Sequence, residues 1–269
     1  MGFRWFGEQN DPVQLAEIRQ IPGVSQAVTA LYDVPVGQVW PKDRIAQLKQ
    51  AVTSAGLGFE VIESVNVHDD IKTGQSGRDQ YIENYQQTIK NLAEAGVKVI
   101  CYNFMPVFDW LRTDLTYQLP DGSNAMAYQP EMLPDDPNEL IHQIMSGSKG
   151  FEMPGWEPER LAHVQQLFAK YRHVDADQLR ANLKYFLDAI MPTCEKYDVR
   201  MAMHPDDPPF LLFGLPRIYK NRDDMLKIEQ LYESPYNAFT ICTGSLGENP
   251  QNDVPAIIRE FVDSDRKST

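Results

Sequence analysis

Polar side chains that could do chemistry lie where the predicted strands of this chain end. Glu63 and Ser64 close one apolar run, Asn103 closes the next, and His204 and Cys242 close two later runs. In a (β/α) barrel the carboxyl ends of the parallel strands converge on one mouth, where active sites are built. Histidine, cysteine and asparagine at these ends therefore predict a site at such a mouth.

His204 opens the segment His-Pro-Asp-Asp-Pro-Pro, which runs from residue 204 to residue 209. Its prolines restrict the backbone, so the segment predicts a rigid turn that presents the imidazole and two carboxylates. Neutral imidazole is a common ligand of divalent metals. The alternative is a histidine that is hydrogen bonded within a tight turn, and this residue alone favours neither interpretation.

Cys242 lies in the segment Thr-Ile-Cys-Thr-Gly-Ser, at the end of the last predicted strand. Buried cysteine is mostly a small apolar core residue, and taken alone Cys242 fits that role better than that of a metal ligand. Cys101 lies inside a predicted strand and Cys194 on the apolar face of a predicted helix, so both are predicted to be core residues. Three widely spaced cysteines are typical of reduced thiols in a cytoplasmic protein.

The loop after Asn103 carries Trp110 and Arg112. Arg112 could make the two-pronged contact that recognises a carboxylate substrate, and Trp110 could supply a flat wall for a sugar chain. The alternative is a surface loop in which Arg112 pairs with Asp109 or Asp114. The loop therefore predicts either a substrate contact or an ordinary ion pair.

The elements that must position these residues alternate between short β-type runs and helical patterns. The β-type runs predict six strands, at residues 3–6, 26–32, 59–65, 97–104, 199–203 and 238–243. Apolar residues at helical spacing predict helices at residues 41–55, 81–95, 175–194, 223–232 and 254–261. This alternation favours parallel βαβ units and an α/β fold. No Gly-x-Gly-x-x-Gly segment follows a predicted strand, so the sequence lacks the motif that would indicate a dinucleotide-binding (Rossmann) sheet.

One long segment, residues 105–174, interrupts the alternation and contains seven prolines. Loops of that length inside a compact domain are usually functional or carry helices of their own, and residues 157–171 have a helical pattern. We therefore expect one domain over residues 1–269, with residues 105–174 inserted after the strand that ends at Phe104 as a lid or cap.

The composition is that of an acidic globular protein. There are 25 Lys and Arg residues against 38 Asp and Glu residues, which gives a net charge of −13. That balance argues against nucleic acid as a partner, because phosphate binding needs clustered basic residues. Apolar runs near the roughly 20 residues of a membrane span are absent from the sequence. We expect a soluble, acidic cytoplasmic protein.

Several long and unusual motifs lie along the chain. They are Phe-Arg-Trp-Phe-Gly from residue 3, Ala-Val-Thr-Ala-Leu-Tyr from 27, Val-Ile-Glu-Ser from 61, His68-Asp-Asp-Ile-Lys72, Cys101-Tyr-Asn-Phe-Met-Pro-Val-Phe-Asp-Trp110, Arg112-Thr-Asp-Leu, Leu119-Pro-Asp-Gly-Ser, His204-Pro-Asp-Asp-Pro-Pro209, Phe213-Gly-Leu-Pro-Arg217 and Cys242-Thr-Gly-Ser. In this order, from residue 3 to about residue 262, they resemble mannonate dehydratase, a (β/α)₈ barrel of the xylose-isomerase-like kind.

This resemblance implies a hydro-lyase that removes water from D-mannonate to give 2-keto-3-deoxy-D-gluconate in hexuronate (glucuronate) breakdown. It implies Mn²⁺ or Fe²⁺ as cofactor, with His204 and Cys242 as two of four protein ligands. We predict that the substrate is held by Asn103, Trp110, Arg112 and His68. A homo-oligomer is expected.

The family pattern continues with motifs that this sequence does not contain. A second ligand histidine in Ile-x-Phe-x-His and a ligand aspartate in Arg-Pro-Asp-His-Gly are both absent after Phe261. We therefore expect a barrel that lacks its last two βα units, with the catalytic acid and base in the missing part and doubtful activity for the chain alone. Two alternatives stay open: an inactive truncated remnant, and a sugar isomerase or epimerase on the same fold, which would need a carboxylate-rich metal site.

Overall fold

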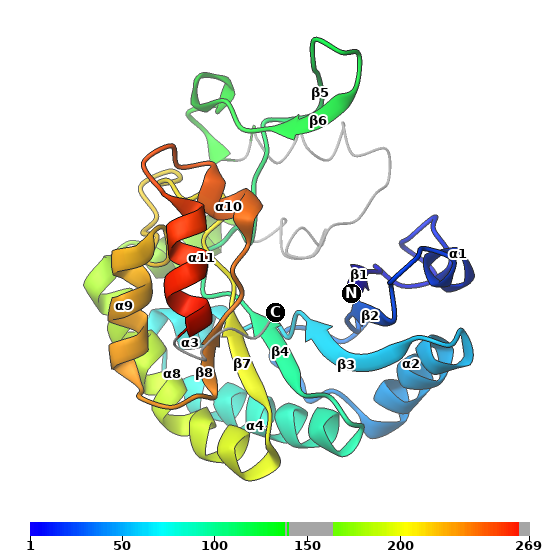
Figure 1. Cartoon of the computed structure of the whole chain (residues 1–269). Helices are drawn as coiled ribbons and strands as arrows, with labels where there is room; N and C mark the ends of the chain where they lie inside the picture. The colour runs from blue at the N-terminus through cyan, green and yellow to red at the C-terminus, as the bar shows by residue number, and fades with distance from the viewer. Residues whose placement is uncertain (138, 140–163, 264–269) are drawn as a thin grey trace.

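A six-stranded parallel sheet forms the centre of the computed structural model, which describes residues 1–137, 139 and 164–263 (Figure 1). The strand order is β1-β2-β3-β4-β7-β8, so each strand lies beside the one before it apart from the inserted hairpin. The strands are β1 Gly2–Arg4, β2 Gln26–Thr29, β3 Gly58–Glu63, β4 Val99–Tyr102, β7 Arg200–Met203 and β8 Asn237–Phe239. All six predicted strands are confirmed, and the chain has an α/β fold.

The parallel register brings the predicted polar residues to one end of the sheet. Glu63 on β3 is the partner of Cys101 on β4, and Tyr102 at the end of β4 is the partner of Met203 at the end of β7. Asn103 and His204 therefore follow two neighbouring strands at the same level. The common position of Asn103 and His204 could be predicted from the sequence, because neighbouring parallel strands end at the same edge of the sheet.

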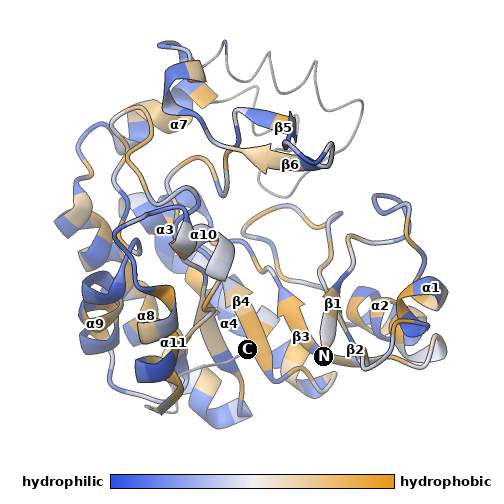
Figure 2. Cartoon of the chain, turned by 45° about the horizontal axis from the view of Figure 1, so that its top comes forward, coloured by the Kyte–Doolittle hydropathy of each residue, from blue (hydrophilic) through white to orange (hydrophobic). Residues whose placement is uncertain are grey.

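Long helices cover the outer face of the sheet (Figures 1 and 2). They are α2 Lys42–Ser54, α4 Arg78–Glu94, α8 Ala176–Tyr197, α9 Arg222–Leu231 and α11 Val254–Asp263. Three short helices that the sequence analysis did not predict complete the connections: α1 Leu15–Arg19, α3 Asp69–Thr73 and α10 Thr243–Gly247. None of the helices in the described part of the chain is long and apolar enough to cross a membrane.

Helix α8 shows why the sequence folds this way. The Asp175 carboxylate caps its N-terminus by accepting a hydrogen bond from the Gln178 N–H at 2.8 Å. The predicted apolar stripe is buried, and Phe186 in its middle packs edge-on against Tyr85 of α4 with ring centroids 5.1 Å apart. The Phe186 ring also lies 6.0 Å from the Tyr102 ring at the end of β4. The apolar stripe thus holds α8 and α4 against the sheet.

The inserted segment differs in part from its predicted form. A two-stranded antiparallel hairpin, β5 Asp114–Gln118 and β6 Asn124–Ala127, projects away from the sheet (Figure 1) and was not predicted. A turn of 3₁₀ helix, Pro130–Met132, follows it. The predicted helix at residues 157–171 is present as α7 over Val164–Tyr171, while residues 157–163 lie outside the described residues.

Candidate active site

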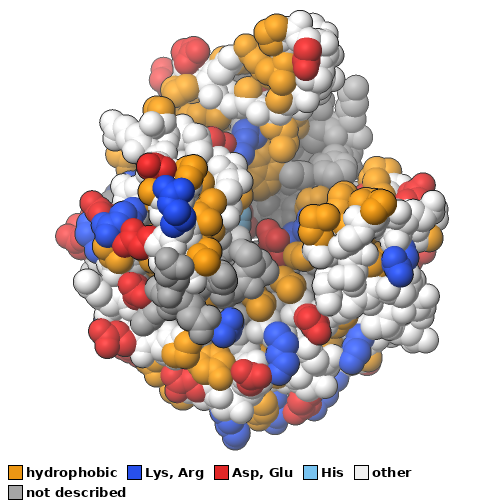
Figure 3. All heavy atoms as spheres, in the orientation of Figure 1, with side chains coloured by type: hydrophobic (Ala, Val, Ile, Leu, Met, Phe, Trp, Pro, Cys, Tyr) orange, Lys and Arg blue, Asp and Glu red, His pale blue; other side chains and the backbone are white. Residues whose placement is uncertain are grey.

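A cavity of about 190 Å³ lies over the carboxyl ends of the strands. Its polar lining includes Arg4, Glu63, Asn103, Asp109 and His204, which follow or end strands β1, β3, β4 and β7. Figure 3 shows that this face of the molecule is hollowed, with acidic, basic and histidine side chains visible inside. The location agrees with the mouth that the sequence predicts.

His204 and Cys242 meet beside this cavity. The imidazole Nδ1 lies 2.8 Å from the backbone oxygen of Pro205, so Nδ1 carries a proton and donates it to that carbonyl. The two side chains of His204 and Cys242 hydrogen bond to each other, which leaves the other ring nitrogen, Nε2, for the sulfur. Cys242 is half-buried as the N-cap residue of α10, where its Sγ also lies 3.2 Å from the Ser245 Oγ.

The two side chains shift each other's protonation. Burial opposes the charged imidazolium, but the hydrogen bond and charge of Cys242 outweigh it and raise the pKa of His204 to about 9. Burial alone would raise the pKa of the Cys242 thiol, but His204 and Ser245 lower it to about 7. At neutral pH His204 therefore favours the imidazolium form, and about half of Cys242 is thiolate.

Arg112 is already occupied by carboxylates. Its guanidinium forms a two-pronged ion pair with Asp207, and its Nη2 lies 2.8 Å from the Oε1 of Glu248. The Asp207 Oδ2 also accepts the hydroxyl proton of Ser245 at 2.8 Å, which links this network to Cys242. Burial and the charge of Asp207 outweigh the attraction of Arg112 and raise the pKa of Glu248 to about 7. Neither predicted partner of Arg112, Asp109 or Asp114, is the carboxylate that binds it.

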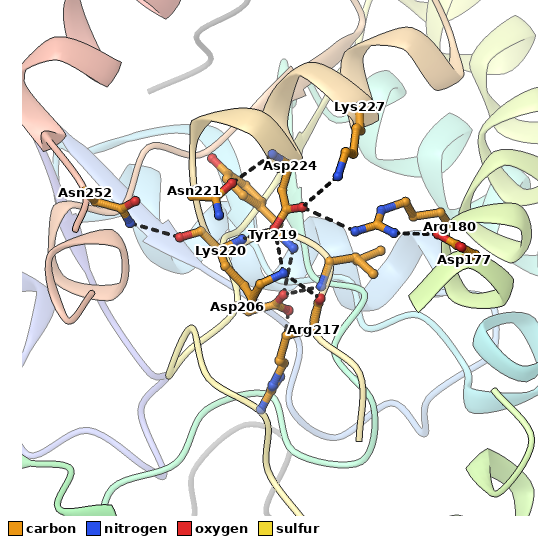
Figure 4. Close-up of polar contacts among 11 residues, drawn as sticks. Asp177, Arg180, Asp206, Arg217, Tyr219, Lys220, Asn221, Asp224, Lys227 and Asn252 are labelled. Atoms are coloured by element: carbon orange, nitrogen blue, oxygen red, sulfur yellow. Dashed lines mark hydrogen bonds and ion pairs between the residues drawn. The ribbon is translucent and has the colours of Figure 1, made fainter. Parts of the chain in front are cut away.

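The turn that carries His204 is anchored by a buried carboxylate (Figure 4). Asp206 Oδ2 accepts hydrogen bonds from the backbone N–H groups of Ile218 and Tyr219 at 2.6 and 2.7 Å. The Arg217 guanidinium is buried 3.8 Å from the other oxygen of Asp206 and donates to the backbone oxygen of Phe108 at 3.3 Å. Arg217 thus joins the turn after β7 to the loop after β4.

The other predicted substrate residues divide between two cavities. Asn103 and Trp110 line the main cavity with His204, and the Asn103 Oδ1 accepts a hydrogen bond from the Met105 N–H at 3.2 Å. His68 instead lines a neighbouring cavity of about 30 Å³. There its Nδ1 caps α3 by accepting from the Asp70 N–H at 3.1 Å, and its ring stacks on Tyr81 at 3.6 Å.

One charged residue that lines the main cavity, Arg4, was not predicted, although its partner Glu63 was identified at a strand end. Arg4, the last residue of β1, has its Nη1 3.1 Å from the Oε2 of Glu63, the last residue of β3. Strand β2 lies between these two strands, so both side chains reach over the carboxyl end of the sheet. The rule that identified Asn103 and His204, a polar residue at the end of a predicted strand, missed Arg4 because the strand was predicted to run to Phe6, whereas β1 ends at Arg4.

His204 and Cys242 fit a divalent transition metal by the chemistry of their donors. Imidazole nitrogen and thiolate sulfur are ligands that Zn²⁺, Fe²⁺ and related ions accept. Within residues 1–137, 139 and 164–263, no third His, Cys, Asp or Glu joins them in a cluster that could hold a metal. Among the described residues, this pair therefore offers two donors that are suited to a divalent metal.

Comparison with known proteins finds mannonate dehydratases that match nearly the whole chain. A family model for D-mannonate dehydratase (UxuA) matches residues 1–267. A mannonate dehydratase of Lactococcus lactis subsp. cremoris is 55% identical over 266 residues, which are 99% of this chain and 74% of that protein. A mannonate dehydratase of Thermotoga maritima is 55% identical over 260 residues, which cover 96% of this chain and 72% of that protein.

Solved structures agree with these relatives. The crystal structure of mannonate dehydratase from Streptococcus suis serotype 2 matches with a TM-score of 0.87 and 44% identity, over 100% of this chain and 71% of that one. A 3-keto-D-glucoside 4-epimerase from E. coli matches with a TM-score of 0.50 and 11% identity, a likeness of fold alone. The family match and the high identity over nearly the whole chain have one consequence: the chain belongs to the D-mannonate dehydratase family.

Proposed function

We propose that this protein is a metal-dependent hydro-lyase that removes water from D-mannonate to give 2-keto-3-deoxy-D-gluconate in hexuronate breakdown. Membership of the family supports the reaction. The observation that carries the proposal in the structure is the pair of His204 and Cys242 beside a polar cavity at the carboxyl ends of the strands. We expect the cofactor to be Mn²⁺ or Fe²⁺.

His204 and Cys242 would hold the metal through the imidazole nitrogen that faces the sulfur and through Sγ. When bound, the ion supplies positive charge that stabilises the negative charge built up as the C2 proton leaves a carbon next to a carboxylate. The backbone oxygen of Pro205 fixes the imidazole ring, because it accepts the Nδ1 proton and leaves Nε2 toward Cys242.

Other residues of the cavity would orient the sugar chain. The Oδ1 of Asn103 is held by the Met105 N–H, so its amide group is fixed in the wall and can donate to a substrate hydroxyl. Trp110 offers an apolar wall beside it, with the Arg112 guanidinium 5.5 Å from its ring centroid. We assign no general acid or base to the described residues.

We expect a (β/α)₈ barrel as the frame for this chemistry, and the consecutive order of the parallel strands supports that expectation. A cytoplasmic homo-oligomer remains our expectation. A sugar isomerase or epimerase would need a carboxylate-rich metal site, and among the described residues the cluster is His204 with Cys242. This donor pair favours the dehydratase over that alternative.

Two assays with added Mn²⁺ test the proposal. The first measures formation of 2-keto-3-deoxygluconate from D-mannonate, with the Streptococcus suis enzyme as positive control. The second measures binding of D-mannonate and of its C2 epimer D-gluconate by calorimetry. We expect selective binding of D-mannonate, which Cys242→Ser should abolish. We expect little or no product from this chain alone, because no general acid or base is assigned to the described residues. Equal binding of the two epimers, without product, would contradict the proposed function.

A further inference from the structure

We propose that Arg4 binds the carboxylate of the sugar-acid substrate and that Arg112 does not. The inference rests on the proposed function, because it names the residue that recognises the acid group of that substrate. It concerns a residue at the end of the first strand that the predicted substrate contacts did not include.

An anionic substrate needs a cationic partner in the cavity. Arg4 is the Lys or Arg residue among the described residues that line the cavity, where it lies with Glu63, Asp109 and Asp207. A guanidinium suits this task, because its planar fork can bind both oxygens of a carboxylate. The charge at this end of the cavity therefore points to Arg4 for the acid group.

The contacts of Arg112 argue against a role for it in binding the substrate carboxylate. Asp207 holds it through two nitrogens, Glu248 binds Nη2, and only 12% of its side chain is exposed. Two carboxylates thus already neutralise a single guanidinium, and Arg112 does not line the cavity. A substrate carboxylate would have to displace one of these partners from a largely buried network.

Arg4 is more open. Its side chain is 24% exposed and has one ion-pair partner among the described residues, Glu63, whose own side chain is 35% exposed. Because β2 separates β1 from β3, the pair spans about 10 Å of sheet at strand spacings of about 4.8 Å. The guanidinium is therefore held over the strand ends, 5.0 Å from the centre of the Phe6 ring. A substrate carboxylate can share or replace Glu63 at this position.

Binding measurements can separate the two arginines. Calorimetry would compare D-mannonate with D-mannitol, which has the same number of carbons and a CH₂OH group in place of the carboxylate. In Arg4→Met we expect D-mannonate to bind about 10- to 100-fold more weakly, the loss of one or two charge-assisted hydrogen bonds, while D-mannitol binds as before. Arg4→Lys should restore part of the affinity. Arg44→Met, on the exposed face of α2, is the matched control and should bind as the wild type does.

Two further variants test whether weaker binding in Arg4→Met comes from the lost contact or from misfolding. Glu63→Gln removes the competing carboxylate, so D-mannonate should bind more tightly than in the wild type. The double variant Arg4→Met/Glu63→Gln removes both charges of the ion pair and should show the same weak binding as Arg4→Met. Circular dichroism would confirm that each variant is folded.

The outcomes distinguish this inference from the proposed function. If the wild type selects D-mannonate over D-mannitol and Arg4→Met keeps that selectivity, the assignment of Arg4 is overturned while the dehydratase proposal stands. If Arg112→Lys alone loses the selectivity, Arg112 is the carboxylate ligand. If the wild type itself does not distinguish the two compounds, both the assignment and the proposed function are wrong.

Discussion

The imidazole of His204 is hydrogen bonded to the sulfur of Cys242, across two neighbouring strand ends of one parallel sheet. The pKa of Cys242 is about 7 and that of His204 about 9, so the thiolate and imidazolium forms coexist between these values. Their mutual attraction stabilises the fold most between these two values, because it needs both charged forms. It is lost as the pH falls through about 7, where the thiolate is protonated, and as the pH rises through about 9, where the imidazolium loses its proton.

The first prediction concerns the reactivity of the Cys242 thiol. In the metal-free protein, alkylation of Cys242 by iodoacetamide should reach half of its maximal rate near pH 7, because the thiolate is the nucleophile. In His204→Gln the midpoint should rise to or above the ordinary cysteine value of about 8.5. Peptide mass spectrometry over a series of pH values measures the rate at each cysteine separately.

Cys101 and Cys194 provide internal controls for this measurement. Both are buried, and burial raises the pKa of both thiols, that of Cys194 to about 12. They should react far more slowly than Cys242 at every pH below 9. A wild-type midpoint at the ordinary cysteine value would show that His204 does not activate the thiol.

The second prediction compares the three cysteines as metal ligands. Co²⁺ added to the wild type should give the near-ultraviolet charge-transfer absorbance of a thiolate ligand. Cys242→Ser should abolish this absorbance. It should also weaken Co²⁺ binding by more than about tenfold, because loss of a residue that only supports a metal ligand already costs about that much affinity. Cys194 makes packing contacts, and the Cys101 sulfur accepts a hydrogen bond from the Thr240 hydroxyl at 3.2 Å. Cys101→Ser and Cys194→Ser should therefore keep the absorbance. Equal losses in all three variants would mean that Cys242 has a structural role.

The sheet and the long helices could be predicted from local patterns, because each depends on residues close in sequence. The stripe on α8 has a regular spacing and a capping aspartate at Asp175. The β5–β6 hairpin was missed although Leu115, Tyr117 and Leu119 alternate with polar residues and Asp121-Gly122 is a strong turn signal. The many prolines of the insertion are typical of loops and helix starts, so they did not favour a strand pair there.

The site could be predicted in part. Strand ends located Asn103 and His204, since the register of parallel strands sets their common level. The partners of Arg112 could not be found from sequence, because Asp207 and Glu248 lie 95 and 136 residues further along the chain and meet it only through the fold. The same holds for Arg4 and Glu63, which reach each other across β2.

The third prediction tests the packing of α8 against the sheet. Phe186→Ala should lower the free energy of unfolding by about 3–5 kcal/mol, because the fully buried ring leaves a cavity between α8, α4 and the end of β4. Tyr185→Ala is the matched control on the same helix: its side chain is 40% exposed and it should cost about 1 kcal/mol. Urea denaturation followed by circular dichroism measures both. A loss below about 1.5 kcal/mol for Phe186→Ala would contradict this packing.

The last prediction uses the surplus of carboxylates around Arg112. Asp207 already binds Arg112 with two oxygens, so the ionised form of Glu248 is disfavoured by burial and by the charge of Asp207, and the pKa of Glu248 rises from 4.5 to about 7. The folded protein therefore holds a proton that the unfolded chain has lost between these two values, and stability falls as the pH rises from about 4.5 to about 7. Glu248→Gln removes this loss. Its melting temperature should equal that of the wild type at pH 5 and exceed it at pH 8, whereas Glu233→Gln, at an exposed position, should show no such pH-dependent difference. Thermal denaturation of the three proteins from pH 5 to pH 8 gives the comparison. A Glu248→Gln variant that is less stable than the wild type at pH 8 would show that the ion pair of Glu248 with Arg112 outweighs its burial and the repulsion from Asp207.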